Sequence, residues 1–136
     1  MLILPEKVAS AIIEQAKKGL PEEVCGYLAG TGDTVCRHYP LTNTDASGEH
    51  FSMDPSEQFA AVKEMRSLGL RPLAVYHSHP ETPARPSKED IRLAFDPRIS
   101  YVIVSLAEKT PIIKSFKIRG GEVSLQDIKI SEEVIP

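Results

Sequence analysis

The hydrophobic positions of this 136-residue chain change period several times, which predicts helices alternating with strands. Val8, Ile12 and Ala16 recur at helical spacing, and Gly19 follows them as a natural helix end. Further along, Asp54-Pro55-Ser56-Glu57 combines a capping carboxylate, a first-turn proline and a glutamate three residues after the cap. Helices are expected over residues 5–18, 54–68 and 87–95.

Between the helices, runs of apolar and β-branched residues predict strands. They are expected over residues 24–30, 34–41, 71–78, 101–106, 111–119 and 122–130, and residues 50–53 can add a short strand. Residues 73–76 are continuously apolar, which indicates a central strand covered on both faces. The last two strands should pair antiparallel across Gly120-Gly121. Together these elements predict an α/β fold, a three-layer domain with a mixed sheet flanked by helices, formed by residues 1–136 as one domain.

Composition and charge exclude several function classes. Hydrophobic residues make up 41% and charged residues 26%, as in a globular domain, and the formal net charge is −3. No nucleic-acid partner is therefore expected, and no membrane partner, because no apolar run approaches the roughly 18 residues of a membrane span. The first residues carry no basic segment typical of a secretory signal. Cys25 and Cys36 form no C-x-x-C pair and are expected to be reduced thiols in a cytoplasmic protein.

Chemistry-bearing residues concentrate after the predicted central strand. His77 and His79 are two residues apart, so their imidazoles point to the same side of a strand and can hold one cation. Asp90 is the best third ligand, since it lies in the first turn of the next helix with Ser87 as the N-cap. Each piece also has an ordinary explanation: H-x-H pairs occur on surfaces, and Ser87 with Asp90 is a common capping box. The motifs of metallo-β-lactamases, cupins and zinc deaminases fit the following residues less well.

The spacing His77-x-His79-x7-Ser87-x2-Asp90 resembles the motif of the JAMM (JAB1/MPN+) metallopeptidase family. Residues 22–30, 43–55 and 101–106 also resemble the family's core, so that the resemblance covers nearly the whole chain. It implies an MPN/JAB1 domain of cytidine-deaminase-like architecture. It also implies one Zn²⁺ on the two histidines and the aspartate, with a water as the fourth ligand. In this resemblance Glu23 is the general base, and Ser87 hydrogen-bonds the developing oxyanion.

The glutamate is the least determined of these residues, because Glu22 and Glu23 are adjacent and point to opposite faces of a strand. The E-x-C-G register favours Glu23, while a pair of solvated carboxylates is the ordinary alternative. Cys25 has no histidine left to act as its base and is expected to be structural. His38 and His50 have no partner spacing and are expected to be ordinary side chains.

The resemblance implies a hydrolase that cuts an amide or isopeptide bond after the C-terminal Gly-Gly tail of a ubiquitin-like or sulfur-carrier protein, as compact prokaryotic members do. Two alternatives remain open. One is a catalytically silent MPN scaffold, and the other is a zinc hydrolase of small amino-acid conjugates or dipeptides. The oligomeric state and the need for an activating partner are left open by the sequence.

Overall fold

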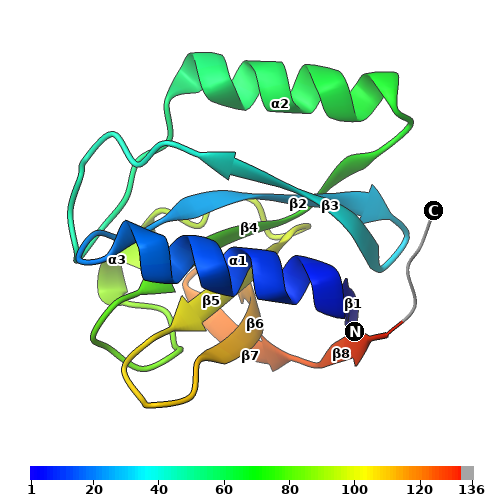
Figure 1. Ribbon diagram of the computed structural model, residues 1–136. Helices are drawn as coiled ribbons and strands as arrows, with labels where there is room; N and C mark the ends of the chain where they lie inside the picture. Colours follow the sequence, from blue (N-terminus) through cyan, green and yellow to red (C-terminus); the bar gives the residue numbers. More distant parts are fainter. Residues whose placement is uncertain (133–136) are drawn as a thin grey trace.

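A curled eight-stranded mixed sheet organises the computed structural model, which describes residues 1–132 (Figure 1). The strand order is β7-β6-β5-β4-β2-β3-β1-β8. The strands are β1 (Leu2–Pro5), β2 (Cys25–Thr31), β3 (Thr34–Leu41), β4 (Arg71–His79), β5 (Ser100–Ser105), β6 (Ile112–Arg119), β7 (Glu122–Gln126) and β8 (Ile128–Ser131). The central strand β4 pairs antiparallel with β2 and parallel with β5, as expected for the most apolar segment.

The helices divide between the two faces of the sheet, which confirms the predicted layers. They are α1 (Glu6–Gly19), α2 (Pro55–Ser67) and α3 (Lys88–Arg92). On one face, Ile12 and Ala16 of α1 pack with Leu28 and Val102 in the main core. On the other face, α2 contributes Met65 to a second cluster. α3 covers a third cluster around Ile103 and Phe116 on that same side.

Strand β1 was not expected, and the last predicted strand divides in two. Residues 122–130 were predicted to form one strand, but β7 ends at Gln126 and β8 begins at Ile128. β7 pairs with β6, whereas β8 pairs in parallel with β1 at the opposite end of the strand order. Gln126 accepts hydrogen bonds from the Ser100 and Ser115 hydroxyls, which fixes the end of β7. The sheet therefore curls around α1 until its two outer strands follow one another in the chain.

Two further expectations about boundaries were wrong. α3 ends at Arg92 rather than near residue 95, since the Tyr101 hydroxyl accepts a hydrogen bond from the Asp96 amide and donates to the Asp96 carbonyl. Residues 50–53 do not form a strand; Met53 alone makes an isolated β-bridge, with Asn43. The Asn43 side chain takes the backbone groups that a strand partner would use.

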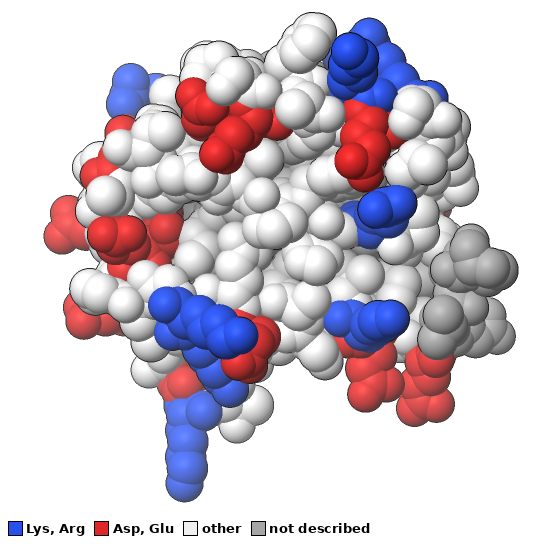
Figure 2. Space-filling model, turned by 45° about the horizontal axis from the view of Figure 1, so that its top comes forward, with Lys and Arg blue, Asp and Glu red and all other residues white. Residues whose placement is uncertain are grey.

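On the face shown in Figure 2, acidic and basic side chains lie among one another around a largely uncharged centre. Among the residues drawn there, no continuous field of one sign covers this face, in keeping with the net charge of −3. None of the helices within residues 1–132 has the length and apolar character needed to span a bilayer.

Candidate metal centre

The end of β4 places two imidazoles side by side on the α2 and α3 face of the sheet. His77 and His79 are each only 3% exposed. Their neighbours in the sheet hold this strand end, since β4 is paired with β2 as far as His77 and with β5 up to its last residue, His79. Phe51 stacks on the His77 ring with centroids 4.7 Å apart. The two side chains that the sequence predicted as ligands are therefore buried and held in orientation.

The segment between β4 and α3 is pinned at several points and returns the chain to the histidines. The His79 Nδ1 atom donates to the Pro83 carbonyl at 2.9 Å, and the Ser105 hydroxyl donates to the Thr82 carbonyl at 2.6 Å. Ala84 is buried in the cluster beneath α3. This rigid return places the first turn of α3 beside the end of β4.

The capping box of α3 orients the third predicted ligand. The Asp90 amide donates to Ser87 Oγ at 3.0 Å, and the Ser87 amide donates to Asp90 Oδ2 at 2.9 Å. Ser87 and Asp90 thus do form the common capping box that the sequence suggested. However, the same Asp90 Oδ2 atom also lies 3.1 Å from Nε2 of His77 and 3.1 Å from Nε2 of His79. The capping carboxylate therefore faces both imidazoles.

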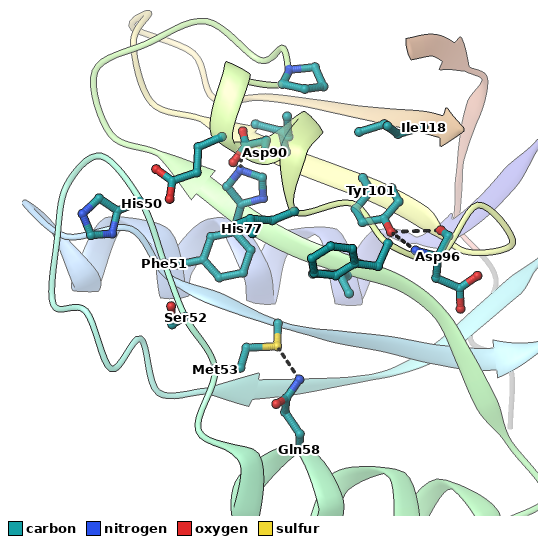
Figure 3. Close-up of a pocket in the computed structure, with 16 residues that line it drawn as sticks. His50, Phe51, Ser52, Met53, Gln58, His77, Asp90, Asp96, Tyr101 and Ile118 are labelled. Atoms are coloured by element: carbon teal, nitrogen blue, oxygen red, sulfur yellow. Dashed lines mark hydrogen bonds and ion pairs between the residues drawn. The ribbon is translucent and has the colours of Figure 1, made fainter. Parts of the chain in front are cut away.

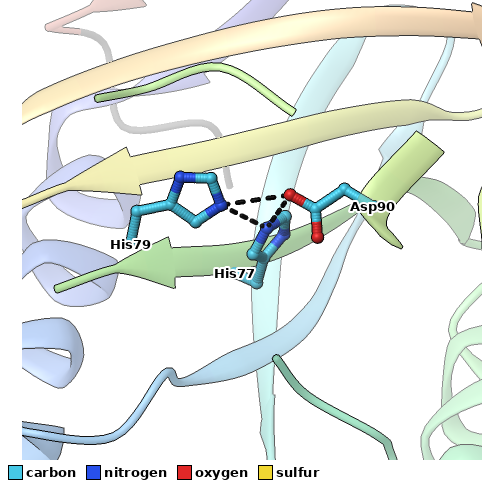
Figure 4. A group of neighbouring side chains, drawn as sticks. All are labelled: His77, His79 and Asp90. Atoms are coloured by element: carbon cyan, nitrogen blue, oxygen red, sulfur yellow. Dashed lines mark hydrogen bonds and ion pairs between the residues drawn. The ribbon is translucent and has the colours of Figure 1, made fainter. Parts of the chain in front are cut away.

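The three ligand atoms form a nearly equilateral triangle (Figure 4). The two Nε2 atoms are 3.1 Å apart, which equals their distances to Asp90 Oδ2. Zinc–nitrogen bonds of about 2.0–2.1 Å in tetrahedral geometry place ligand atoms about 3.3 Å apart. His77, His79 and Asp90 thus fit one zinc-sized cation with three ligands on one side.

The hydrogen positions call for a positive charge at this point, either a proton or a metal cation. Because His79 donates from Nδ1, the Nε2 atom of its neutral ring carries a lone pair. That lone pair faces the Asp90 carboxylate and the His77 ring, an arrangement that repels unless a positive charge lies between them. Burial lowers the pKa of His77 and so favours its neutral, metal-binding form. In the metal-free chain a proton takes this place: burial opposes the charged form of His79, but its hydrogen bond to Asp90 outweighs burial and raises its pKa. Burial also opposes ionisation of Asp90, but hydrogen bonds from the protonated histidines outweigh it and keep the pKa of this carboxyl low.

Glu23 lies beside this triad and is 3% exposed, whereas Glu22 is exposed to solvent. Its backbone is held by a loop: the Glu23 amide donates to the Ser47 carbonyl, and the Asn43 side chain donates to the Glu23 carbonyl. Among the buried side-chain oxygen and nitrogen atoms of residues 1–132, Glu23 Oε1 alone has no hydrogen-bond partner. An unpartnered buried carboxylate oxygen is costly, so it indicates a donor supplied from outside the chain.

The chain matches the family described as prokaryotic homologs of the JAB domain over residues 5–119. It belongs to this family. The resemblance to the JAMM (JAB1/MPN+) family is thereby confirmed, together with the predicted α/β fold of a mixed sheet between helices.

Two relatives of this JAB-family chain show how far the likeness extends. The CysO-cysteine peptidase of Mycobacterium tuberculosis is 32% identical over 136 residues, which cover 98% of this chain and 93% of the relative. The desampylase of Haloferax volcanii is 34% identical over 111 residues, covering 76% of this chain and 80% of the relative. The solution structure of protein DSY2949 from Desulfitobacterium hafniense is 51% identical, with a TM-score of 0.90, and covers 98% of this chain and 95% of that one.

A cleft with a volume of about 410 Å³ opens next to the triad of His77, His79 and Asp90 (Figure 3). His77 and Asp90 lie at one end of it, and Tyr101 and Ile118 lie further along its wall. Most of the remaining lining is apolar, and Phe95 at its rim is 82% exposed. An apolar cleft that ends at titratable side chains is the usual form of an active site.

Cys25 is a packing residue, as expected from the sequence. It pairs with His77 in the sheet register, but it is fully buried and its thiol faces the Leu41 carbonyl. Burial raises the pKa of this thiol to about 12, which excludes a thiolate near neutral pH. The adjacent Gly26 allows β2 to pass close to its neighbours, because a Cβ there would lie 2.3 Å from the Tyr39 carbonyl oxygen.

Sequence reasoning included residues 43–55 in the family resemblance but assigned no role to the loop over residues 42–53. Asn43 holds this loop with its amide group, which donates to the carbonyls of Glu23 and His50, while its Oδ1 accepts from the amides of Asp45 and Ser52. The loop brings Phe51 against His77 and His50 into the cleft. The resemblance assigned these residues no contacts, since their partners are backbone groups and a ring far away in the chain.

Burial raises the pKa of Glu23 from 4.5 to about 8, with the nearby His79 opposing the shift and Asp90 adding to it. In the metal-free chain, folded Glu23 therefore keeps its proton between these pH values, while the unfolded chain releases it. The contribution of Glu23 to the free energy of unfolding therefore falls as pH rises through this window. We expect metal-stripped Glu23→Gln to gain stability over metal-stripped wild type progressively from pH 5 to pH 8, in urea unfolding. Glu22→Gln should follow wild type at every pH, and parallel curves for Glu23→Gln would contradict the shift.

Proposed function

We propose that this chain is a zinc-dependent metallopeptidase that hydrolyses the amide bond after the C-terminal Gly-Gly tail of a ubiquitin-like or sulfur-carrier protein. The observation that carries the proposal is the unpartnered Glu23 carboxylate oxygen, buried beside a triangle of two imidazoles and one carboxylate. The relatives named CysO-cysteine peptidase and desampylase support hydrolysis of carrier conjugates. The cytoplasmic location, the single domain over residues 1–136 and the assignment of each site residue stay predictions.

In this proposal His77, His79 and Asp90 would hold one Zn²⁺, with a water as its fourth ligand. Zinc supplies Lewis acidity, which brings the pKa of a bound water from 15.7 to about 7 and polarises a carbonyl. Glu23 accepts the proton of the attacking water at its free oxygen and later returns it to the leaving nitrogen. Its raised pKa suits both steps, because the group can hold a proton and release it near neutral pH.

Ser87 is proposed to stabilise the oxyanion. Its Oγ accepts a hydrogen bond from the Asp90 amide, so its own hydrogen is free to be donated. Removal of a single oxyanion donor typically costs about 10²–10³ in turnover. The scaffold alternative is less well supported, since His77, His79 and Asp90 lie close enough together to hold an ion and the buried Glu23 is present as well.

A panel of carrier proteins tests this function directly. Each carrier has the ubiquitin-like fold and ends in Gly-Gly followed by a short extension, and each is incubated with the zinc-loaded chain. We expect at least one to be cut after the second glycine, as read by mass spectrometry, and its Ala-Ala counterpart to remain intact. Removal of the metal by a chelator should stop cleavage, and added Zn²⁺ should restore it. Failure to cut any of the carriers with zinc-loaded chain contradicts the proposal.

A further inference from the structure

A row of paired side chains crosses the sheet from the metal centre to the edge strand β7. It takes one residue from each of four neighbouring strands: Val75, Tyr101, Phe116 and Leu125. Each residue of the row pairs directly with the next, and directly opposed residues share one face of a sheet. Val75 lies two residues before His77, on the same face of β4, so the row begins beside the triad. It ends at Leu125, which is 65% exposed.

The far end of this row belongs to an exposed apolar surface. Leu93 and Phe95 line the cleft together with Ile118, and both are exposed. Ile118 is buried, but its cross-strand partner on β7 is the exposed Val123. We call Leu93, Phe95, Val123 and Leu125 the β7 patch. Several large apolar side chains exposed in one place on a globular domain indicate an interaction surface.

The backbone of β7 is open at this surface as well. β7 stands at the end of the strand order and pairs with β6, and no further strand within residues 1–132 covers its outer edge. Its side chains from Glu122 to Leu125 are all exposed. An uncovered edge strand can pair with or pack against another protein. Both the side chains and the backbone of β7 are therefore available to a partner.

The distance from the triad to β7 suits a short extended tail. Neighbouring strands lie about 4.8 Å apart, so the three steps from β4 to β7 cover about 14 Å. An extended chain advances about 3.3 Å per residue and crosses this distance with about four residues. The cleft follows the same direction, since its lining passes from His77 over Tyr101 to Ile118 (Figure 3). A tail whose cleaved bond lies at the triad thus brings the body of its protein to β7.

We propose that the β7 patch binds the folded body of the carrier whose Gly-Gly tail occupies the cleft. The inference rests on the proposed function and adds a contact remote from the cleaved bond, which distinguishes a folded carrier from a free peptide of the same tail. The occupant is the carrier rather than a second copy of this chain, because Leu93 and Phe95 belong to both the patch and the cleft. The matching surface of the carrier is apolar and lies where its tail leaves the fold.

The first test compares folded carriers with free peptides. For each carrier of the panel, kcat/KM is measured beside that of a peptide with only its last four residues before the cleaved bond and the same extension. We expect the zinc-loaded wild type to prefer a folded carrier by about tenfold or more, as for a few buried apolar contacts. The double variant Val123→Ser/Leu125→Ser should lose this preference through a higher KM, and should cut the peptide as the wild type does.

Ile130→Ser is the matched control, because Ile130 is an apolar residue on β8 that is 48% exposed and lies outside the patch. It should keep the wild-type preference. Equal kcat/KM of the wild type on carrier and peptide overturns the inference and leaves the proposed function standing. A double variant that keeps the preference overturns it as well. If the zinc-loaded wild type cuts neither carriers nor peptides, the proposed function itself fails, and the inference falls with it.

A titration observes the contact without any cleavage or substitution. The isotope-labelled wild-type chain is mixed with each carrier of the panel ending at Gly-Gly, and its amide signals are followed by NMR. We expect the signals of residues 122–126 to shift together with those of the cleft. Shifts in the cleft with none in β7 overturn the inference. Shifts of β7 that depend on the concentration of this chain alone assign the patch to a second copy and overturn it too.

Discussion

His77→Ala is expected to lose bound zinc almost completely and to abolish cleavage of every conjugate. The substitution removes one of three ligand atoms that lie 3.1 Å apart and leaves the half-buried Asp90 carboxylate facing a single imidazole. A catalytic zinc site rarely survives with two protein ligands. Metal analysis after dialysis should give about one zinc per wild-type chain, as for a single three-ligand site, and a small fraction of that for the variant.

The variant must be shown to fold before this loss is assigned to the ligand. His38→Ala is the matched control, since it removes a half-buried histidine from β3 and should keep its zinc. Circular dichroism should give the same spectrum for both variants and for metal-stripped wild type. A fully zinc-loaded His77→Ala would show that the triangle of side chains does not hold the ion.

Glu23→Gln is expected to keep its zinc and to lose turnover by about 10²–10⁴, the usual contribution of a general acid–base group. Glutamine preserves the shape of the side chain but cannot accept and return a proton. Because Glu23 is not among the three ligand atoms, metal analysis of the variant should match wild type. The loss should appear in kcat more than in KM, since binding of the tail does not require this proton transfer.

Glu22→Gln supplies the control for this experiment, since Glu22 is the adjacent residue and is exposed. It should have wild-type turnover. Full activity of Glu23→Gln together with loss in Glu22→Gln would move the base by one residue, to the register that the sequence left as the alternative. A loss of zinc in Glu23→Gln would make the glutamate a ligand instead.

Much of the candidate site could be predicted because each part of it is formed by residues close together in the chain. The two-residue spacing of the histidines and the capping box of Asp90 each follow from the geometry of a single element. The resemblance to a family then indicated that the two elements meet. Glu23 was harder, because adjacent glutamates differ only in which one faces the sheet interior. The burial of Glu23 and exposure of Glu22 now distinguish them.

What the sequence did not predict depends on partners distant in the chain. β1 was not predicted, and residues 128–130 were predicted only as the end of one longer strand, because β1 and β8 are four residues each and neither has a period of its own long enough to identify it. The role of the Asn43 loop was not predicted for a similar reason, since its amide side chain bonds backbone groups of Glu23, His50, Asp45 and Ser52 that no sequence pattern connects. The end of α3 was predicted too late in the chain, because no glycine or proline marks it. Instead, the Tyr101 hydroxyl hydrogen-bonds the amide and carbonyl of Asp96 after the helix.

The pairing of β1 with β8 joins residues 2–5 to residues 128–131, the most widely separated segments of the sheet. During synthesis, β1 can bind β3 early, but its other edge stays open until almost all of the described chain has been translated. An open edge strand is a site of misassociation with other nascent chains. β8 is therefore the last strand to join the sheet. Until it does, one edge of β1 is open to pairing with other chains, and afterwards β1 has a neighbour on both edges.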